Sequence, residues 1–563
     1  MGAWLTRQAG AVRRGATWRA RLGAAARLYL AYAVCHVFLR VYRFVRKSRL
    51  DRAVLAGLPG YGPDPLGYEL MRNFHRLHEW RRETLLKFPG AHLVLTQSPG
   101  NEVAAVSEEA VRFVLKDAFE HFTKPDAMTF YLAEELGHFI GADGIFVLRH
   151  GAQQPALRAE HDKWFAQRKA ASKIFTKNNF NQFMGKVFSD KAERLVALMG
   201  RVADDGAKTD FQRLAFSFTM DSVQKVFFSR EVDTLEAPDE FAAAFDAAHH
   251  SMMMYLLGNV PVLICSSLFL PWPFGSLWGK HWTNVFLYAH KRLDPHGRNM
   301  LAACKVLDDR TYELVRAARQ DADLEQRNDL LAQFLKLGDR LSDKELHDII
   351  LNFIIAGRDT TACTLTWFMF EMTQHPEAQA QLCAEIDRVL CGAEPSAELM
   401  EPTSMPFLTG CLYETLRLHP PVPEDQKECT QDCVFTSKDG KTSQRIPKGT
   451  RVSFIPYSQC RDPTVWDKPD EFRPLRWVPF VEPSPYAFPV FQAGPRLCLG
   501  RDMAKFEAKL VVCKLWQRFT FTLLPGEASK ITYSNSITMS LVNDKATNST
   551  NLWVLPQRRT LPA

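Results

Sequence analysis

The sequence predicts a mainly α-helical protein with small β-sheets, folded as one large domain behind a basic N-terminal segment. Two observations predict this fold class. Apolar residues recur at helical spacing from Glu69 to about Leu418, and short strand-like runs separated by Pro and Gly follow them. A hydrophobic content of 46% with 24% charged residues is typical of a globular protein and excludes a fibrous or disordered chain.

The first fifty residues differ from the rest in charge. Residues 1–50 contain ten Arg and Lys47 but no acid, so they carry +11 in a chain whose net charge is +7. The remaining residues sum to −4, which argues against a nucleic-acid-binding surface. Arg27 and Arg40 flank twelve uncharged residues, which favours a tilted or interfacial membrane anchor. An organelle targeting peptide, and a secretory signal or disordered arm, are the alternatives.

A Pro- and Gly-rich stretch over residues 51–66 predicts a hinge between this segment and the body, residues 67–563. The twelve Cys of the chain are scattered, without the paired spacing of a disulfide scaffold. This pattern indicates a reducing compartment for the body.

One predicted helix is far longer than the ordinary 11 to 12 residues. It begins at Ser342, with Glu345 three residues later as a capping box, and extends about 32 residues to His375-Pro376. A helix of this length must cross the whole domain. The polar residues 357–361 in its middle therefore predict either a kink with satisfied side chains or a site where the helix opens for a ligand.

Residues 251–279 contain no formally charged residue. Their length alone permits a membrane-spanning helix, but Pro261, Pro271 and Pro273 argue against one straight span. A pair of loops that dip into lipid or line a substrate channel is the favoured interpretation. A core segment and a true span are the alternatives.

Cys498 lies in a loop bounded by glycines. Arg496 stands two residues before the thiol, and a predicted helix starts just after it, so both would lower the pKa of the cysteine and favour the thiolate. A buried, inert cysteine would not require these neighbours. The five positions at fixed offsets in this loop are Phe491, Gly494, Arg496, Cys498 and Gly500.

With this loop the sequence resembles the cytochrome P450 family, the haem-thiolate monooxygenases, over about residues 57–545. The resemblance implies the cytochrome P450 fold, with the long helix over haem b and Cys498 as the axial ligand to the haem iron. A thiolate in that position favours O–O cleavage. Phe491, Gly494 and Gly500, with Arg496, would form the rest of the haem-binding loop.

Four further motifs carry the resemblance in the expected order. Residues 356–361 match the oxygen-activation motif, with Gly357 at the cofactor and Asp359 and Thr360 as the acid–alcohol pair that relays protons to dioxygen. The other three motifs lie around the haem in the family. Trp164 and Arg168 match the helix that faces a haem propionate, and Arg496 would serve the other face of the same carboxylates. Glu414 and Arg417 match the Glu-x-x-Arg motif, and residues 472–477 supply Arg476 as the third member of a structural ion network behind the haem.

Residues 416–427 and 491–496 are similar to the plant-type fatty-acid omega-hydroxylases of this family. The similarity implies insertion of one oxygen atom of O2 at or near the terminal carbon of a fatty acid, with a narrow apolar channel that selects the carbon. Monooxygenation of another lipid (a sterol, alkane or terpenoid), a haem-thiolate isomerase, and a non-catalytic haem sensor or lipid carrier are the alternatives. Residues 148–160 are an insertion relative to this branch. They lie beside the expected substrate entrance, so the similarity leaves substrate specificity open.

The electrons are expected to come from a separate protein. Only 65 residues follow Cys498, too few for a fused flavin domain, and no dinucleotide-binding Gly-x-Gly-x-x-Gly follows a predicted strand. The resemblance implies an NADPH-dependent flavoprotein reductase, and a basic face would dock it or would simply be solvated. We expect the endoplasmic reticulum membrane, with the body facing the cytosol; the mitochondrion is the alternative. The basic residues of that face are Arg168, Lys169, Lys173 and Lys177.

Overall fold

The chain divides into two compact units, one of residues 55–245 and 305–563, the other of residues 1–54 and 246–304. All the predicted site residues lie in the first unit, and the predicted N-terminal anchor lies outside the described residues. The computed structural model describes residues 54–55, 57–62, 68–97, 102–125, 139, 141–176, 179, 183–269, 289–336, 341–544 and 549–560.

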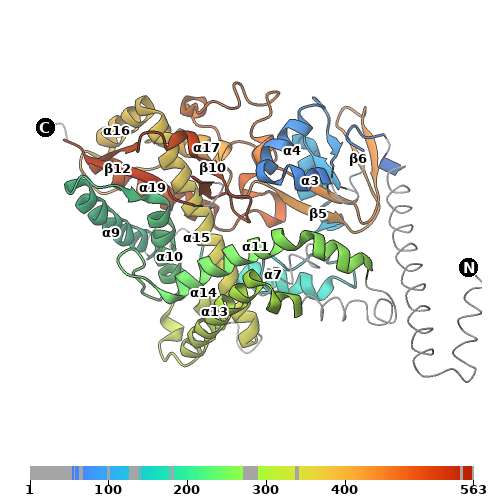
Figure 1. The fold of residues 1–563 in the computed structure, drawn as a ribbon, viewed down its shortest axis with the longest axis horizontal. Coiled ribbons are helices and arrows are strands. Elements are labelled where there is room, and N and C mark those ends of the chain that lie inside the picture. Colours follow the sequence, from blue (N-terminus) through green and yellow to red (C-terminus); the bar gives the residue numbers. More distant parts are fainter. Residues whose placement is uncertain are drawn as a thin grey trace, which may run out of the picture. The chain divides into compact units, whose positions relative to one another are not determined.

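Helices dominate the first unit, as the sequence predicts (Figure 1). Two further helices, α11 (Glu240–Phe269) and α13 (Pro295–Arg319), have bounds that cross the sequence limits of the two units. The α-helices of the first unit are α3 (Tyr68–Arg72), α4 (Leu77–Leu85), α5 (Glu108–Arg112), α7 (Arg158–Ser172), α9 (Gly185–Asp204), α10 (Phe211–Phe228), α14 (Leu330–Leu335), α15 (Asp343–Gln374), α16 (Pro376–Leu390), α17 (Pro406–Leu418), α18 (Pro456–Gln459) and α19 (Arg501–Arg518).

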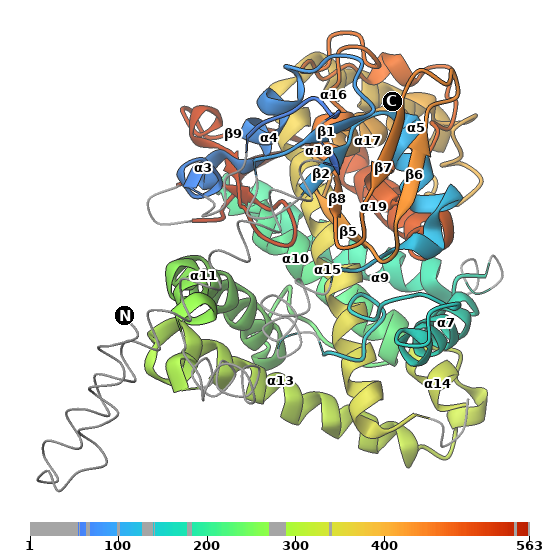
Figure 2. The ribbon, with the colours of Figure 1, turned by 90° about the vertical axis from the view of Figure 1, so that its right-hand side faces the viewer.

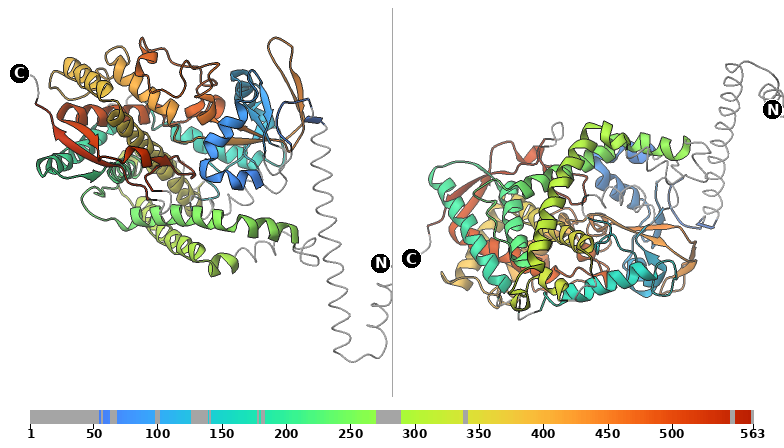
Figure 3. Two further views of the ribbon diagram at one scale, coloured as in Figure 1. Left: turned by 45° about the horizontal axis from the view of Figure 1, so that its top comes forward. Right: turned by 90° about the horizontal axis from the view of Figure 1, so that it is seen from below.

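The strands form small sheets. Figure 2 shows β1, β2, β8 and β5 side by side in a five-stranded sheet of order β1-β2-β8-β5-β3, in which only the β2–β8 pair is parallel. A three-stranded sheet, β4-β12-β9, packs on α9 near the C-terminal end of the described chain (Figure 3). The strands are β1 (Leu93–Leu95), β2 (Glu102–Ala105), β3 (Phe122–Thr123), β4 (Thr209–Asp210), β5 (Asp425–Cys429), β6 (Cys433–Thr436), β7 (Ser443–Ile446), β8 (Arg451–Phe454), β9 (Phe519–Leu523), β10 (Thr532–Tyr533), β11 (Leu541–Val542) and β12 (Trp553–Arg558).

Helix α15 confirms the predicted long helix. It spans 32 residues, and its capping box is present, because Ser342 Oγ accepts from the Glu345 N–H and the Glu345 side chain accepts from the Ser342 N–H. The helix ends at Gln374 because Pro376 disfavours helical geometry in the residue before it, and Pro376 then begins α16. α15 is largely buried and packs against α10, α17 and α19.

Gly357 brings α15 and α10 close together. A Cβ at this position would lie 2.6 Å from Val223 Cγ2 and 3.3 Å from the Phe227 ring. The glycine therefore allows close packing of two helices next to the polar residues of α15.

Part of the uncharged stretch is helical, contrary to the predicted pair of loops. Residues 251–269 belong to α11, which continues through Pro261, so the loop prediction is wrong for this part. Residues 270–288 lie outside the described residues. Among the residues that the structure describes, no helix is both long and apolar enough to cross a membrane.

Candidate functional site

Cys498 stands at the end of a tight loop, directly before α19. Its N–H donates to the Phe491 carbonyl over 2.9 Å, which closes the loop. Gly494 has φ +64°, and a Cβ there would collide with the Leu115 carbonyl, so the loop requires glycine at this position. Gly500 is the N-cap residue of α19. The loop thus holds an accessible thiol at the start of a helix.

The charge around the thiol differs from the expectation. The thiol has accessible surface but lies deep among protein groups, and the desolvation by these groups raises its pKa, which the Gly500 N–H and Arg168 offset only in part. The sequence predicted a lowered pKa for the Cys498 thiol, and this prediction is wrong when only protein groups surround the thiol. Arg168, and not Arg496, is the arginine whose charge favours the thiolate here. Arg168 also donates to the Leu497 carbonyl over 2.6 Å. A coordinated metal ion would supply the remaining charge, because it deprotonates a thiol outright.

Arg496 lies on the face of a buried tryptophan. Its guanidinium carbon is 4.4 Å from the centroid of the Trp164 ring, in cation–π geometry. Its Nε donates to His150 Nδ1 over 3.0 Å, and one terminal nitrogen donates to the Leu148 carbonyl over 2.7 Å. Burial lowers the pKa of Arg496 to about 9, with the charge of Arg168 acting in the same direction.

Positive charge gathers around Asp425 of β5. Its carboxylate pairs with Lys427 at 2.6 Å and with Lys124 at 3.4 Å, and its charge also acts on Arg496. Burial works to raise the pKa of Asp425, but the two lysines outweigh burial and hold that pKa well below its usual range. Burial lowers the pKa of Lys427 to about 7. A buried region in which cations exceed carboxylates is suited to a ligand that carries carboxylates.

The polar residues of α15 hold separate partners. Asp359 is fully buried, and its Oδ1 accepts from Arg358 over 2.9 Å. The guanidinium carbon of Arg358 lies 4.7 Å and 5.2 Å from the ring centroids of Phe216 and Phe245. Thr360 is partly exposed, and its hydroxyl donates to the Ala356 carbonyl over 2.7 Å. Thr364 and Thr366 bond the carbonyl four residues back in the same way, and α15 is continuous here, so this bond satisfies the hydroxyl and gives no sign that the helix opens for a ligand.

The three residues of the predicted ion network lie together. Glu414 pairs with Arg417 at 2.8 Å and with Arg476 at 2.9 Å. Glu414 and Arg417 are fully buried. Arg417 also donates to the carbonyls of Cys460 and Pro469, so the network joins α17 to two later segments of the chain.

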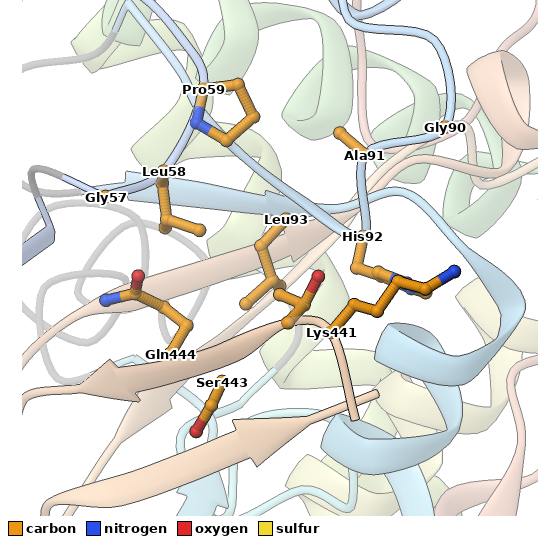
Figure 4. Close-up of a pocket in the computed structure, with 11 residues that line it drawn as sticks. Gly57, Leu58, Pro59, Gly90, Ala91, His92, Leu93, Lys441, Ser443 and Gln444 are labelled. Carbon is orange, nitrogen blue, oxygen red and sulfur yellow. The ribbon is translucent and has the colours of Figure 1, made fainter. Parts of the chain in front are cut away.

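A second feature, a cleft of about 350 Å³, lies apart from these groups (Figure 4). It is lined by residues 57–59, 90–93 and 441–444, which include neither a carboxylate nor a thiol. None of the predicted site residues contributes to this cleft.

Comparison with known proteins identifies the family of the chain. The sequence model of the cytochrome P450 family matches residues 122–549. The chain belongs to the cytochrome P450 family. It is 30% identical to cytochrome P450 CYP94D108 of Paris polyphylla over 504 residues, covering 86% of this chain and 89% of that protein. It is 29% identical to cytochrome P450 704C1 of Pinus taeda over 514 residues (84% and 88%) and to the cytochrome P450 monooxygenase cyp1 of Mycosarcoma maydis over 463 residues (76% and 65%).

The groups of this cytochrome P450 fit a haem. Cys498 offers an accessible thiol for the iron, and three cations would hold the haem carboxylates: the buried Lys427 and the partly exposed Arg168 and Arg496. A bound haem with a thiolate ligand supplies the activation of O2 for insertion into a C–H bond of a small-molecule substrate. The chain is therefore a haem-thiolate monooxygenase that depends on a redox partner.

Several functional groups escaped the sequence analysis. His150 lies in the insertion, and its contact with Arg496 spans 346 positions of the sequence, so no local pattern reveals it. Asp425 and Lys427 were detectable in principle, because alternate residues of a strand share one face, and β5 buries these two charges on the same face. Arg358 stood within the oxygen-activation motif, but its adjacency to Asp359 does not disclose their pairing.

We expect Thr360→Ala to retain haem but to release reducing equivalents as peroxide. The Thr360 hydroxyl carries an exchangeable proton, and Thr360 is the partly exposed member of the Asp359–Thr360 pair. A positioned proton-transfer group accelerates a reaction by roughly 10²-fold or more. Product formed per NADPH consumed is measured together with peroxide. Thr366→Ala is the matched control, because Thr366 makes the same bond to a carbonyl four residues back, over 2.7 Å, but is fully buried. Full coupling in Thr360→Ala would contradict the proton-relay role.

Proposed function

We propose that this monooxygenase hydroxylates fatty acids at or near the terminal carbon. The similarity of residues 416–427 to the plant-type fatty-acid omega-hydroxylases carries the proposal. The similarity to the relatives from Paris polyphylla and Pinus taeda, which extends over most of the chain, is consistent with that branch.

Contacts of two apolar segments support the proposal. The Met539 N–H donates to the Pro421 carbonyl over 2.9 Å, and the Met539 carbonyl accepts from Trp367 Nε1 of α15 over 2.8 Å. These bonds fix the segment around Met539 against both α15 and the segment after α17. Val422, which follows Pro421, and Ile537, two residues before Met539, are partly exposed. Apolar side chains on segments fixed in this way suit selection of one carbon by shape, which a terminal methyl requires because its C–H bond is stronger than those of the neighbouring methylenes.

We further propose that a separate flavoprotein reductase delivers the electrons from NADPH, and that residues 1–50 attach the protein to the endoplasmic reticulum membrane with the body in the cytosol. Lys169 and Lys173 are exposed on and just after α7 and suit an acidic partner. Arg168, by contrast, bonds the cysteine loop, so it serves the cofactor side rather than the docking face. Lys177 lies outside the described residues.

Product analysis tests the substrate proposal. The purified full-length protein, a surrogate flavoprotein reductase and NADPH are incubated with saturated and unsaturated fatty acids, an alkane and a sterol. We expect hydroxy fatty acids with the hydroxyl at or near the methyl end, and none when the reductase is omitted. Turnover of only the alkane or the sterol would refute the fatty-acid proposal while leaving the monooxygenase assignment intact. Peroxide release without any oxygenated lipid would also contradict it.

A further inference from the structure

The insertion, residues 148–160, is an ordered strap with contacts at both ends and in its middle. Arg149 and Glu160 form an ion pair at 2.6 Å that closes the strap on itself. In its middle, the Ala152 N–H donates to the Glu120 carboxylate over 3.0 Å, and Gln154 donates to the Thr430 hydroxyl over 2.6 Å. The strap is therefore tied to two other parts of the first unit.

The strap places one histidine in the interior. The His150 side chain is fully buried, and its ring stacks on Phe119 with centroids 3.8 Å apart and an interplanar angle of 10°. Its Nε2 lies 3.1 Å from the Phe119 carbonyl, which can only accept, so Nε2 carries the proton and Nδ1 is an acceptor. The His150 backbone N–H donates to the Thr123 hydroxyl over 2.8 Å. Burial and the charge of Arg496 hold the pKa of His150 well below its usual range, so the ring stays neutral.

This neutral acceptor faces Arg496. Nδ1 of His150 accepts from Arg496 Nε at 3.0 Å, and the Leu148 carbonyl accepts from a terminal nitrogen at 2.7 Å. The strap thus supplies both short hydrogen bonds that Arg496 makes to protein acceptors, and a third contact, to the Ile145 carbonyl, measures 3.5 Å. A guanidinium has five N–H donors. The three contacts with described residues therefore leave donors of Arg496 for a ligand.

We propose that residues 148–160 are a positioning strap for the cofactor: His150 and the Leu148 carbonyl hold the Arg496 guanidinium flat on Trp164, with its remaining donors available to a haem carboxylate. His150 is a positioning residue, since it acts through Arg496. The proposal rests on the haem-thiolate assignment and is independent of the substrate. It gives a role to a segment for which the family resemblance offers none.

Release of haem from the full-length holoprotein to an excess of apomyoglobin tests the strap. His150→Phe keeps the stacking ring on Phe119 but removes the acceptor. A hydrogen bond to a charged group changes a binding constant by about tenfold or more. We therefore expect His150→Phe to release haem roughly tenfold faster than the parent. We also expect the resonance Raman bands of the haem propionates to shift, which a change in stability alone would not produce. His150→Gln restores an acceptor and should recover most of both properties.

Two other variants separate positioning from stability. Gln154→Ala removes a hydrogen bond of the same strap that does not involve Arg496, and we expect haem release and the propionate bands to stay as in the parent. If His150→Phe does not fold, Thr123→Val removes the hydroxyl that accepts from the His150 backbone N–H and lies 3.4 Å from Nδ1, and it should give a smaller change in the same direction. Parent-like release and propionate bands in His150→Phe, equal acceleration in Gln154→Ala, or no recovery in His150→Gln would each overturn the proposal.

Discussion

Cys498→Ala is expected to lose the thiolate-type carbon monoxide spectrum and the monooxygenase activity together. The loop presents this thiol at the start of α19, next to Arg168 and the Gly500 N–H, and no other side chain in the loop 491–500 offers a soft metal ligand. Loss of groups that only support a metal ligand already costs 10- to 100-fold. We therefore expect product formation to fall by more than about 10²-fold.

The reduced, carbon monoxide-treated spectrum of equal amounts of protein is the first measurement, and haem content per chain is the second. Cys391→Ser is the control, because Cys391 is the other exposed cysteine in the described part of the chain. It stands at the C-cap of α16, and we expect its variant to match the parent in both measurements. A thiolate-type spectrum that survives in Cys498→Ala would remove the axial ligand from this loop.

The thiol of Cys498 also shows how far sequence reasoning extends. The loop itself was predictable, because its five characteristic positions fall within ten residues, although one reason for Gly494, the close approach of the Leu115 carbonyl, comes from a distant segment. The pKa of the thiol was not predictable, because desolvation depends on all the segments packed around the loop. Desolvation by the surrounding protein raises the pKa of Cys498 against the effect of Arg168 and the Gly500 N–H, and no local sequence pattern indicates it.

In the fold, too, features set by local sequence were predictable and those set by distant contacts were not. The bounds of α15 were predictable because each end has a local signal. The capping box at Ser342 begins the helix, and Pro376 ends it through the residue before it. The path of residues 251–269 was not, because an apolar stretch with Pro261 suits several environments, and the chain forms α11 there. The position of the strap, residues 148–160, depends on contacts between distant segments, such as His150 with Arg496 and Gln154 with Thr430, which no spacing rule connects.

Glu414→Gln is expected to destabilise the protein by about 3–5 kcal/mol, since it breaks a fully buried ion pair and leaves the partner charge in place. Five donors converge on the two oxygens of Glu414: two from the Arg417 guanidinium, the Arg473 N–H, the Arg476 Nε and the Trp477 indole N–H, each at 2.8–2.9 Å. Glutamine keeps the shape but turns one acceptor into a donor that faces other donors. A loss of this size is a large part of the 5–15 kcal/mol that stabilises an ordinary domain.

Urea unfolding followed by far-UV circular dichroism measures this loss, and Glu83→Gln is the matched control. Glu83 pairs with Arg76 at 2.7 Å on the surface, and exposed pairs contribute no more than about 1 kcal/mol.

The pH dependence of stability is a second test of the same network. Burial opposes ionisation of Glu414, but Arg417 and Arg476 outweigh it and lower the pKa of Glu414. Its ionised form therefore contributes stability above the ordinary glutamate pKa, and that contribution is lost as the pH falls through the lowered value. The parent should lose stability over this acid range, and Glu414→Gln should lose correspondingly less. A variant that unfolds within about 1 kcal/mol of the parent would show that packing, and not this network, holds α17 to the segments that follow it.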